Sequence, residues 1–421
     1  MATKVKDFED VAHSNLTERE GMSTGPVPIA PYHSRAFFER EAAQIFGRAW
    51  LLVARVEEIP EPGSFVVKDI SPTKANALIT RSASGRIQAF HNTCSHRGSQ
   101  IVYETEGRQN RFTCPYHAWT YKNDGELLAV PDESNFFDFD KKNCGLTKIH
   151  TEVWEGWVFI NLQAQPEVSL KEFLGDFAPY FEGYEYLGAD SPVVFEIELD
   201  ANWKVASDAF IETYHIAAIH PGTLKDGFTS PNNPWGRLLD AKLYGAHRTV
   251  SMYGNPNYKT DPKHRVEAFA AGLGETGNVI SAATKAETAK YLSHQAVNPG
   301  KVPPWSMDVN HIFPHVHIDS GPGGFWVHWF WPLSENRTRY EGRFYMSEAQ
   351  GFAARMIQEL YVSRVVTAIC EDITSMQRTQ RGLESGGKTH MILQDSEFGI
   401  RHNVEQCIKW VEAATVKEAL S

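Results

Sequence analysis

Alternating apolar and polar residues in the first part of the chain predict a small antiparallel β domain. Its strand-like runs are short, rich in β-branched residues and separated by turn-forming pairs such as Ser71-Pro72 and Ser84-Gly85. The runs cover residues 64–70, 76–81 and 86–91, and the segment TEVWEGWVFINL, which ends at residue 162, closes the domain. Upstream, residues 33–49 place Phe, Ile and Ala among charges at helical spacing, which predicts an amphipathic helix leading into the domain.

The remainder of the chain shows strand patterns first and helical patterns later. The predicted strands are 193–199, 309–318, 325–333 and 338–346, and the predicted helices are 349–381 and 396–419. This order favours an antiparallel α+β domain over a parallel doubly wound sheet. Residues 255–304 are polar, rich in Gly and Pro, and weakly helical near 285–294. They are a candidate lid over a site, although a surface insertion explains them equally well.

Length and composition limit the classes of protein that fit. A chain of 421 residues has room for two domains with separate cores. No segment approaches the roughly 18 uninterrupted apolar residues that a membrane span needs, so we expect no membrane partner. Residues 1–20 lack the apolar stretch of a secretory signal, so we expect a cytoplasmic location. The formal charge of -11 argues against a nucleic-acid partner, because phosphate binding needs a concentrated Lys/Arg face.

The first constellation of candidate ligands lies inside the β domain. Cys94-x-His96 is followed, 17 residues later, by Cys114-x-x-His117. Two cysteines and two histidines also satisfy tetrahedral zinc, so the ligand count alone leaves two metals open. Zinc fingers usually present a Cys pair and then a His pair, whereas here each loop supplies Cys and then His. That order is expected when one iron takes both sulfurs and the other takes both imidazoles, and it favours a [2Fe-2S] cluster over structural zinc.

A second constellation lies in NWKVASDAFIETYHIAAIHPGT, where His215 and His220 are five residues apart. On an ideal helix this spacing separates them by about 140°, so a regular helix would not bring them together. Pro221 disfavours the α conformation at His220, which predicts that His220 lies past the helix end and folds back. Adjacent Glu371 and Asp372 offer carboxylates. Two imidazoles and one carboxylate are the ligand set of non-haem Fe(II) oxygenases, and they leave positions on the iron open for O2. The alternative interpretation is that the two histidines are ordinary polar residues at a helix end and that Glu371 and Asp372 form a solvated acidic patch.

These segments resemble the α subunits of the Rieske non-haem iron, ring-hydroxylating oxygenases. The resemblance covers about residues 30–415 and is strongest at NTCSHRG, at CPYHAWTY with Gly125 shortly after, and at the two iron-site segments, the first of which begins with Asn202-Trp203-Lys204. One departure is Ala118, where Rieske loops mostly carry Gly, and it removes no ligand.

The resemblance implies an α+β fold class. An N-terminal extension and helix (1–49) would precede an all-β Rieske [2Fe-2S] domain (50–162) and a helix-grip catalytic domain with an antiparallel sheet and long helices (163–421). The ligands that it implies are Cys94, His96, Cys114 and His117 for the cluster, and His215, His220 and Asp372 for the mononuclear iron. Asp372 is placed by counting back from Met376, and Glu371 is the fallback.

The resemblance also implies partners. Such subunits usually form a ring of three, with or without a β subunit, in which the cluster of one subunit lies next to the iron of its neighbour. The family bridges that interface with a carboxylate three residues before the first iron-binding histidine. Here the position holds Glu212, which would link His117 of one subunit to His215 of the next. The alternative is a surface Glu inside a helix.

A glycine-rich segment, GLGETG at residues 272–277, matches the spacing of a dinucleotide fingerprint. It follows HRVEAFAA, a helical and partly polar stretch rather than a buried strand, so a Gly-rich turn explains the same letters. We therefore expect NAD(P)H to act only indirectly, through a separate reductase with or without a ferredoxin.

The resulting hypothesis is a terminal oxygenase that uses reductant-derived electrons and O2 to hydroxylate an aromatic or similar apolar small molecule at the mononuclear Fe(II). The alternatives are a monooxygenase or demethylase of a methylated or amine substrate, and a pure Rieske electron carrier, which the second ligand set disfavours. A third alternative is a zinc-stabilised binding module, which would be colourless, whereas a Rieske protein is red-brown. Candidate residues for a substrate pocket are Asp208, Ala209, Ile211, His315 and His317, with Trp326 and Trp329 as further candidates.

Overall fold

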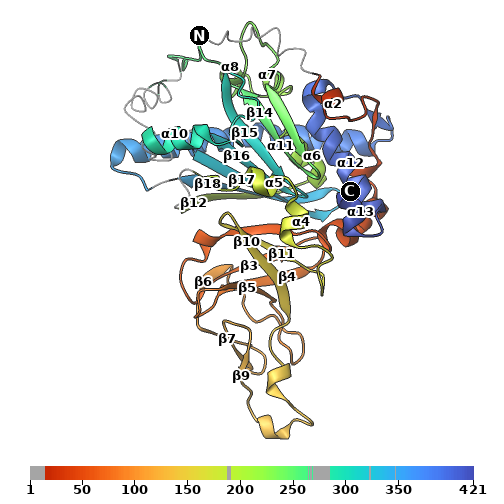
Figure 1. The fold of residues 1–421 in the computed structure, drawn as a ribbon, viewed down its shortest axis with the longest axis vertical. Coiled ribbons are helices and arrows are strands. Elements are labelled where there is room, and N and C mark those ends of the chain that lie inside the picture. The colour runs from red at the N-terminus through yellow and green to blue at the C-terminus, as the bar shows by residue number, and fades with distance from the viewer. Residues whose placement is uncertain are drawn as a thin grey trace. The chain divides into compact units, whose positions relative to one another are not determined.

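The computed structural model describes residues 15–186, 191–263, 265, 268, 285–321, 324–346 and 348–421. The chain divides into two compact units (Figure 1). The larger unit contains Met1–Arg40, Leu174–Ala413 and Ala419–Ser421, and the smaller unit contains Glu41–Phe173 and Ala414–Glu418. None of the described helices combines the length and the apolar composition that a bilayer span requires. The glycine-rich segment 272–277 and much of the candidate lid lie outside the described residues.

The smaller unit is built from two antiparallel sheets. A seven-stranded sheet has the order β2-β11-β10-β5-β4-β3-β6, and a three-stranded sheet has the order β7-β8-β9. The strands are β2 (Leu51–Arg55), β3 (Ser64–Ile70), β4 (Ala75–Arg81), β5 (Ile87–His91), β6 (Glu106–Arg108), β7 (Arg111–Thr113), β8 (Thr120–Lys122), β9 (Leu127–Ala129), β10 (Lys148–Trp154) and β11 (Trp157–Asn161). The predicted strands 64–70, 76–81 and 86–91 are confirmed as β3, β4 and β5.

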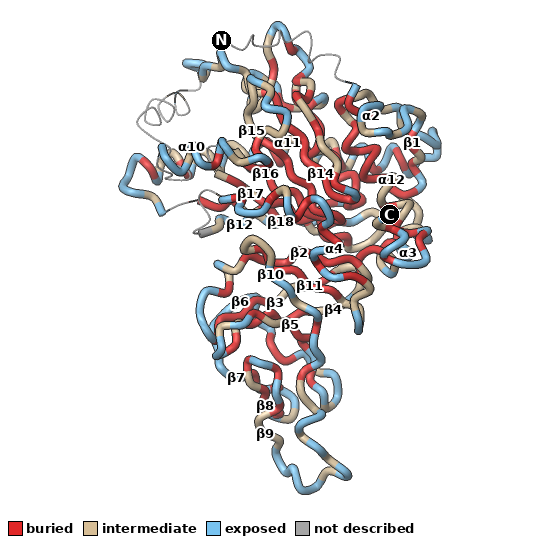
Figure 2. Tube along the Cα trace, viewed as in Figure 1, coloured by how far each residue is buried: buried red, intermediate tan, exposed pale blue. Residues whose placement is uncertain are grey.

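The larger unit contains a seven-stranded antiparallel sheet of the order β12-β18-β17-β16-β15-β14-β13. Its strands are β12 (Ser191–Leu199), β13 (Asp240–Tyr244), β14 (His247–Tyr253), β15 (Trp305–Ile312), β16 (Val316–Gly321), β17 (Gly324–Ser334) and β18 (Arg337–Met346). The predicted single strand 309–318 is wrong, because the chain reverses there and Ile312 pairs with Val316. Figure 2 shows the central strands of this sheet as buried.

Helices of the larger unit pack on that sheet. The α-helices among the described residues are α2 (Leu16–Arg19), α3 (Arg35–Glu41), α4 (Leu170–Leu174), α5 (Phe177–Tyr180), α6 (Trp203–Asp208), α7 (Ile216–Ile219), α8 (Lys225–Phe228), α10 (Lys285–Ser293), α11 (Phe352–Glu384), α12 (Phe398–Glu412) and α13 (Val416–Leu420). The short α6 packs against β17 and β18 and contacts both α11 and α12. It therefore holds the following segment, with the two candidate histidines, between the sheet and the long helix.

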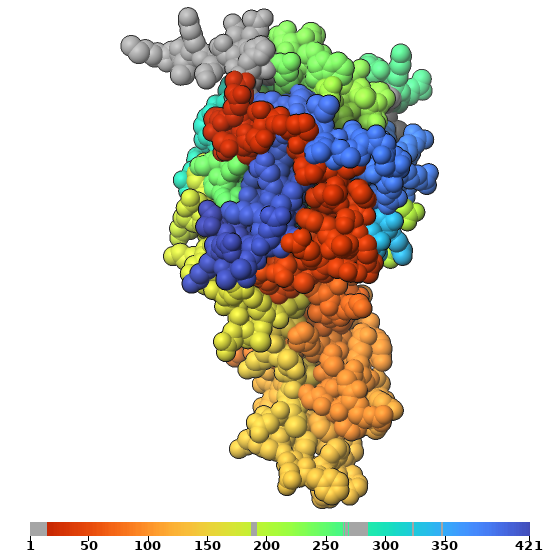
Figure 3. Space-filling model, turned by 90° about the vertical axis from the view of Figure 1, so that its right-hand side faces the viewer, coloured from red at the N-terminus to blue at the C-terminus, as the bar shows by residue number. Residues whose placement is uncertain are grey.

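The N-terminal segment lies along the C-terminal helical region of the larger unit (Figure 3). The two-residue strand β1 (Val27–Pro28) pairs with β19 (His390–Met391). The backbone N–H groups of Leu16 and Thr17 donate to the Asp395 carboxylate at 2.9 and 2.8 Å. The predicted helix over 33–49 begins as α3 and continues as a π-helical turn, Ala42–Phe46.

Candidate metal centres

The two candidate cluster loops of the smaller unit have similar backbone turns. The first follows β5 and the second joins β7 to β8. In the first loop the N–H of Gly98 donates to the Cys94 carbonyl at 2.9 Å, and in the second the N–H of Ala118 donates to the Cys114 carbonyl at 3.0 Å. Gly98 and Ala118 both have left-handed backbone conformations, with φ of 78° and 58°. Ala118, where Rieske loops mostly carry Gly, therefore has a backbone conformation that Gly adopts more easily than Ala.

The four candidate ligands of these loops separate by type. Cys94 and Cys114 are buried next to each other, with 3% and 2% of their surface exposed. His96 and His117 are partly exposed, and their ring centroids lie 4.6 Å apart. This arrangement suits a diiron cluster with both sulfurs on one iron and both imidazoles on the other. The donor set therefore fits the group that the sequence predicts.

The buried side chain of Tyr121 reaches the first cluster loop, which the sequence did not indicate. Its hydroxyl accepts a hydrogen bond from the Ser95 N–H at 3.0 Å and lies 3.2 Å from Cys94 Sγ. Because the N–H occupies the oxygen as acceptor, the hydroxyl proton is available for the sulfur. Trp119 stacks on His96 with ring centroids 5.1 Å apart. Tyr121 and Trp119, which follow the second loop, thus contact Cys94 and His96 of the first loop.

A second set of candidate ligands meets in the larger unit. His215 immediately precedes α7 and His220 immediately follows it, so His220 lies past a helix end, as Pro221 indicated. Asp372 lies on α11, which contacts α7. The Asp372 Oδ1 atom lies 3.0 Å from His220 Nε2 and 3.5 Å from His215 Nε2. The three side chains place one ligand atom each within 4.8 Å of one another.

Each histidine of this triad has a carboxylate on its outer nitrogen. His215 Nδ1 hydrogen-bonds to Glu212, and His220 Nδ1 donates to Glu371 Oε2 at 2.7 Å. The hydroxyl of Thr223 also donates to Glu371 Oε2, at 2.6 Å. Glu371, the fallback ligand, therefore lies on the far side of the His220 ring. Both carboxylates orient the rings so that Nε2 faces the common centre.

The triad also has the electrostatics of a cation site. His220 Nε2 is buried and faces Asp372 Oδ1 at 3.0 Å, with no other polar partner among the described residues. Burial acts to lower the pKa of His215 and of His220, but the surrounding carboxylates raise both pKa values overall. Two imidazole nitrogens and one carboxylate oxygen, with a free side, fit Fe(II) as used by non-haem oxygenases.

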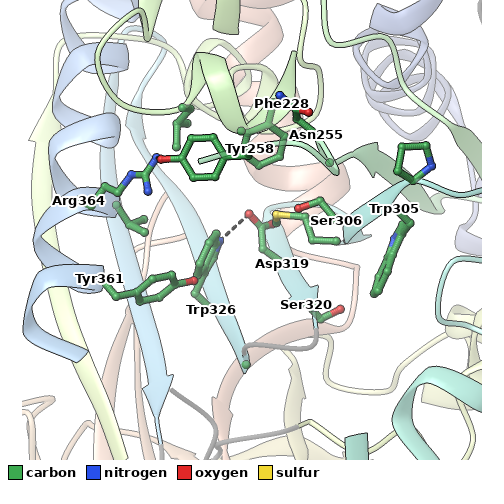
Figure 4. Close-up of a pocket in the computed structure, with 18 of the residues that line it drawn as sticks. Phe228, Asn255, Tyr258, Trp305, Ser306, Asp319, Ser320, Trp326, Tyr361 and Arg364 are labelled. Atoms are coloured by element: carbon green, nitrogen blue, oxygen red, sulfur yellow. Dashed lines mark hydrogen bonds between the residues drawn. The ribbon is translucent and has the colours of Figure 1, made fainter. Parts of the chain in front are cut away.

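Cavities reach the triad from two sides. The inner cavity has a volume of about 110 Å³ and is lined by His215, His220 and Asp372 together with mainly apolar residues. The outer cavity, of about 540 Å³, is drawn in Figure 4. The residues that line both are Leu224, Phe228, Met307, Asp319, Trp326 and Val365. The side cavity, of about 240 Å³, is lined by Glu212, His215 and Asp372. The free side of the triad is thus open to a small molecule.

Some of the predicted pocket residues lie at these cavities. Ala209 lines the inner and side cavities, and Asp208 lines the side cavity. Asp208 is buried and accepts a hydrogen bond from the Tyr32 hydroxyl at 2.6 Å, and burial raises its pKa to about 7. Trp326 lines the inner and outer cavities.

Other predicted pocket residues lie in the core instead. Ile211 packs in a hydrophobic cluster of the larger unit. His317 is covered by α6, where Ser207 Oγ lies 2.9 Å from its Nε2, and His315 packs on Trp331. These three predicted residues are not among the described residues that line the cavities at the triad. Trp329 is also buried, with 1% exposed.

Comparison with known families gives two matches. Residues 189–413 match the family model described as the ring hydroxylating alpha subunit (catalytic domain). Residues 49–149 match the model described as the Rieske [2Fe-2S] domain. The first match spans the triad, and the second spans the two cluster loops. The cofactors of these families are those predicted from the residues.

Several curated relatives share about a third of the aligned residues. The glycine betaine monooxygenase oxygenase subunit of Pseudomonas aeruginosa is 36% identical over 210 residues, which are 50% of this chain and 48% of that protein. The anthranilate 1,2-dioxygenase large subunit of Acinetobacter baylyi is 32% identical over 227 residues, 49% of this chain and 47% of that protein. The chain spans about half the length of the curated relatives it matches.

Solved structures share the fold over nearly the whole chain. The quaternary ammonium Rieske monooxygenase CntA in complex with L-carnitine has a TM-score of 0.69 at 22% identity, covering 97% of this chain and 100% of that chain. Naphthalene 1,2-dioxygenase from Rhodococcus sp. has a TM-score of 0.71 at 21% identity, covering 97% and 98%. At these identities the similarity establishes the fold alone.

Proposed function

Because the chain belongs to the ring-hydroxylating α-subunit family, we propose that it is the terminal oxygenase of an electron-transfer system. In this role it takes up electrons at a Rieske [2Fe-2S] cluster and uses them with O2 to oxidise a small organic molecule. The observation that carries the proposal is the combination, in one chain, of two Cys/His loops and a separate His-His-Asp triad that faces a cavity. A pure electron carrier would need no such triad.

The proposal gives each group of residues a task. Cys94, His96, Cys114 and His117 would hold the cluster, and His215, His220 and Asp372 would hold the Fe(II). When bound, the cluster supplies single electrons and the iron supplies O2 activation. The protein contributes geometry. Glu212 and Glu371 fix the two imidazole rings, and the mainly apolar inner cavity excludes water and holds the substrate next to the triad.

Electron supply and assembly are part of the same proposal. Electrons would come from NAD(P)H only through a separate reductase, with or without a ferredoxin. The subunits would form a homotrimer, with or without a β subunit, in which Glu212 connects His117 of one subunit to His215 of the next. The position of Glu212 supports this role. Its carboxylate already accepts hydrogen bonds from the backbone and the ring of His215, and it is 8% exposed.

The experiment that tests the function is product analysis under labelled O2. The iron-loaded chain is combined with a reductase and a panel of aromatic acids, apolar aromatics and methylated amines. Hydroxylation and dihydroxylation are detected by ¹⁸O in the product. Demethylation is detected by release of formaldehyde and of the demethylated amine, because the labelled oxygen leaves with formaldehyde and exchanges with water. We expect substrate-dependent product of one of these kinds, which His215→Ala abolishes. Reduction and reoxidation of the cluster with neither labelled product nor demethylation of any member of the panel would contradict the proposal.

A further inference from the structure

A buried carboxylate lies at the junction of the inner and outer cavities. Asp319 on β16 is 6% exposed and lines both cavities. Its Oδ2 atom accepts a hydrogen bond from Trp326 Nε1 at 2.5 Å and lies 3.3 Å from His328 Nε2. Its Oδ1 atom has no hydrogen-bond partner among the described residues. In Figure 4 the carboxylate points from its strand toward the rings of Tyr258 and Phe228, with Trp326 beside it.

The described residues leave one oxygen of this carboxylate without a hydrogen-bond donor or a cation. A buried carboxylate oxygen without a partner is costly, and a cation or a strong donor in the cavity would remove that cost. In the described part of the chain, Asp319 forms no ion pair with Lys or Arg. The candidate counter-ion among the residues that the structure describes is His328, whose Nδ1 is already engaged with the Tyr340 hydroxyl at 2.7 Å. The free Oδ1 atom therefore remains available for a ligand.

Aromatic rings surround the space in front of Asp319. The described aromatic residues that line the outer cavity are Phe228, Tyr258, Trp305, Trp326 and Tyr361. The faces of such rings attract cations through their quadrupoles, and quaternary ammonium groups are bound in this way by aromatic cages. A wall of rings alone would also accept a neutral aromatic molecule. The combination with an incompletely partnered carboxylate is what favours a positive charge.

The outer cavity also has a positively charged lining residue, Arg364, which lies away from the junction with the inner cavity. Arg364 on α11 lines the outer cavity and is not among the residues that line the inner one. Its guanidinium donates to the Thr223 carbonyl and to the Tyr258 hydroxyl, the latter at 3.2 Å. A ligand with a positive nitrogen therefore finds its counter-charge at the junction, and any carboxylate on the same ligand is better placed in the outer cavity.

We propose that the two cavities take a small organic cation, either a methylated amine or a quaternary ammonium compound. The charged nitrogen would lie against Asp319 and the neighbouring rings, and a methyl group on it would enter the inner cavity and face the triad. This inference rests on the proposed oxygenase function and names the substrate class of that site. It selects the methylated-amine alternative over the apolar aromatic substrate expected from the sequence.

The test compares ligands that differ in charge and match in shape. Choline is paired with 3,3-dimethylbutan-1-ol, and glycine betaine with 3,3-dimethylbutanoate, because carbon replaces the quaternary nitrogen in each pair. Binding to the iron-loaded full chain is measured by calorimetry without reductase. We expect at least one of the two quaternary ammonium ligands to bind at least about tenfold more tightly than its carbon isostere. Equal or weaker binding of both quaternary ammonium ligands would overturn the inference.

The variant Asp319→Asn keeps the shape of the side chain and removes its charge. It should abolish the preference for the ligand with the quaternary nitrogen and leave the affinity for neutral 3,3-dimethylbutan-1-ol unchanged. The matched control is Glu341→Gln on β18, which removes a carboxylate that is also 6% exposed in the same sheet and lines neither cavity. An undiminished preference in Asp319→Asn would contradict the assignment, and if that variant does not fold, the wild-type comparison still decides.

Failure of this inference is distinguishable from failure of the proposed function. The binding measurement needs neither electrons nor turnover, so charge selectivity can be present in a chain that incorporates no labelled oxygen. Conversely, labelled product from neutral aromatic compounds, with no binding preference for either quaternary ammonium ligand, would support the oxygenase function and contradict the assignment of a cationic substrate.

Discussion

The two candidate metal centres differ in how the chain assembles them. The four cluster donors come from two loops that lie 17 residues apart in sequence, and backbone hydrogen bonds close each loop. The iron triad instead joins two histidines at the ends of α7 to Asp372 on α11. The first site is a local feature of a small β unit. The second exists only after a long helix has packed beside the segment that follows α6.

The surroundings of the two centres differ as well. The cluster cysteines are enclosed and the cluster histidines are partly exposed, which suits electron entry at the surface. The triad is flanked by cavities, and each of its histidines is held by its own carboxylate. A redox carrier needs only an exposed edge, whereas a centre for O2 chemistry needs room for a substrate. The difference predicts that each centre can be altered without loss of the other.

The largest effect is expected for Asp372→Ala. It removes the carboxylate whose oxygen converges with both Nε2 atoms, so the mononuclear iron and all product formation should be lost. The cluster should keep its absorption and its reduced resonance spectrum, because its donors lie in the other unit. Iron analysis with visible spectroscopy measures both. Loss of the cluster in this variant would show that the two centres are not independent.

Glu212→Gln tests the proposed connection between the centres. The amide oxygen can still accept from His215 Nδ1, so both metals should stay bound, but the charge of the proposed bridge is gone. We expect product formation to stop while the cluster is still reduced by the reductase. Rapid-mixing spectroscopy of cluster reoxidation in the presence of substrate measures the block. Normal turnover in this variant would contradict the proposal that Glu212 carries electrons between the two centres.

Glu371→Gln should have a smaller effect on the iron. Glu371 contacts the outer nitrogen of His220 rather than the common centre. Loss of such an orienting carboxylate typically costs about 10- to 100-fold in metal affinity. Competition with a chelator measures the affinity, and Asp372→Ala is the adjacent comparison. A loss of iron as complete as in Asp372→Ala would identify Glu371 as a ligand.

Tyr121→Phe should change the cluster without touching the triad. The hydroxyl of Tyr121 is placed to donate to Cys94 Sγ, and hydrogen bonds to cluster sulfurs stabilise the reduced form. A hydrogen bond worth about 1 kcal/mol corresponds to a potential about 40 mV lower in its absence. A redox titration monitored by paramagnetic resonance measures the shift. Tyr103→Phe, at an exposed position of the same unit, is the control, and equal potentials in both variants would exclude the hydrogen bond.

The smallest effects are expected at the two left-handed turn positions. Open space surrounds the position of a Cβ at Gly98, so only backbone strain counts there. Gly98→Ala should destabilise the protein by about 1 kcal/mol, and Ala118→Gly should stabilise it by up to about 1 kcal/mol. Thermal unfolding of the metal-loaded chain measures both. Shifts of the same sign would show that the loops are not equivalent.

Local features explain what the sequence predicted well. The cluster loops could be recognised because spacing and residue order within short segments carry the information. Likewise, Pro221 indicated that His220 lies past a helix end. The strands β3, β4 and β5 followed from alternation. In these cases the determining contacts lie within a few residues of each other.

Tertiary packing explains what the sequence left open. The choice between Glu371 and Asp372 depends on which side of α11 faces α7, and adjacent helical residues differ by about 100°. The strand β14 is buried throughout although it contains His, Arg, Thr and Ser, so its pattern gives no apolar signal. Asp319 was missed although it lies two residues after His317 on the same strand face. The available signal was an acid on the strand face that already carries His317.

If the chain holds a [2Fe-2S] cluster and a separate mononuclear iron, anaerobic iron and sulfide analysis with paramagnetic resonance after reduction will detect both. We expect one iron beyond those of the cluster for every two sulfides, and a rhombic signal from the reduced cluster that persists in Asp372→Ala. Zinc in place of iron, or iron and sulfide in equal amounts in the fully loaded wild-type chain, would contradict this expectation.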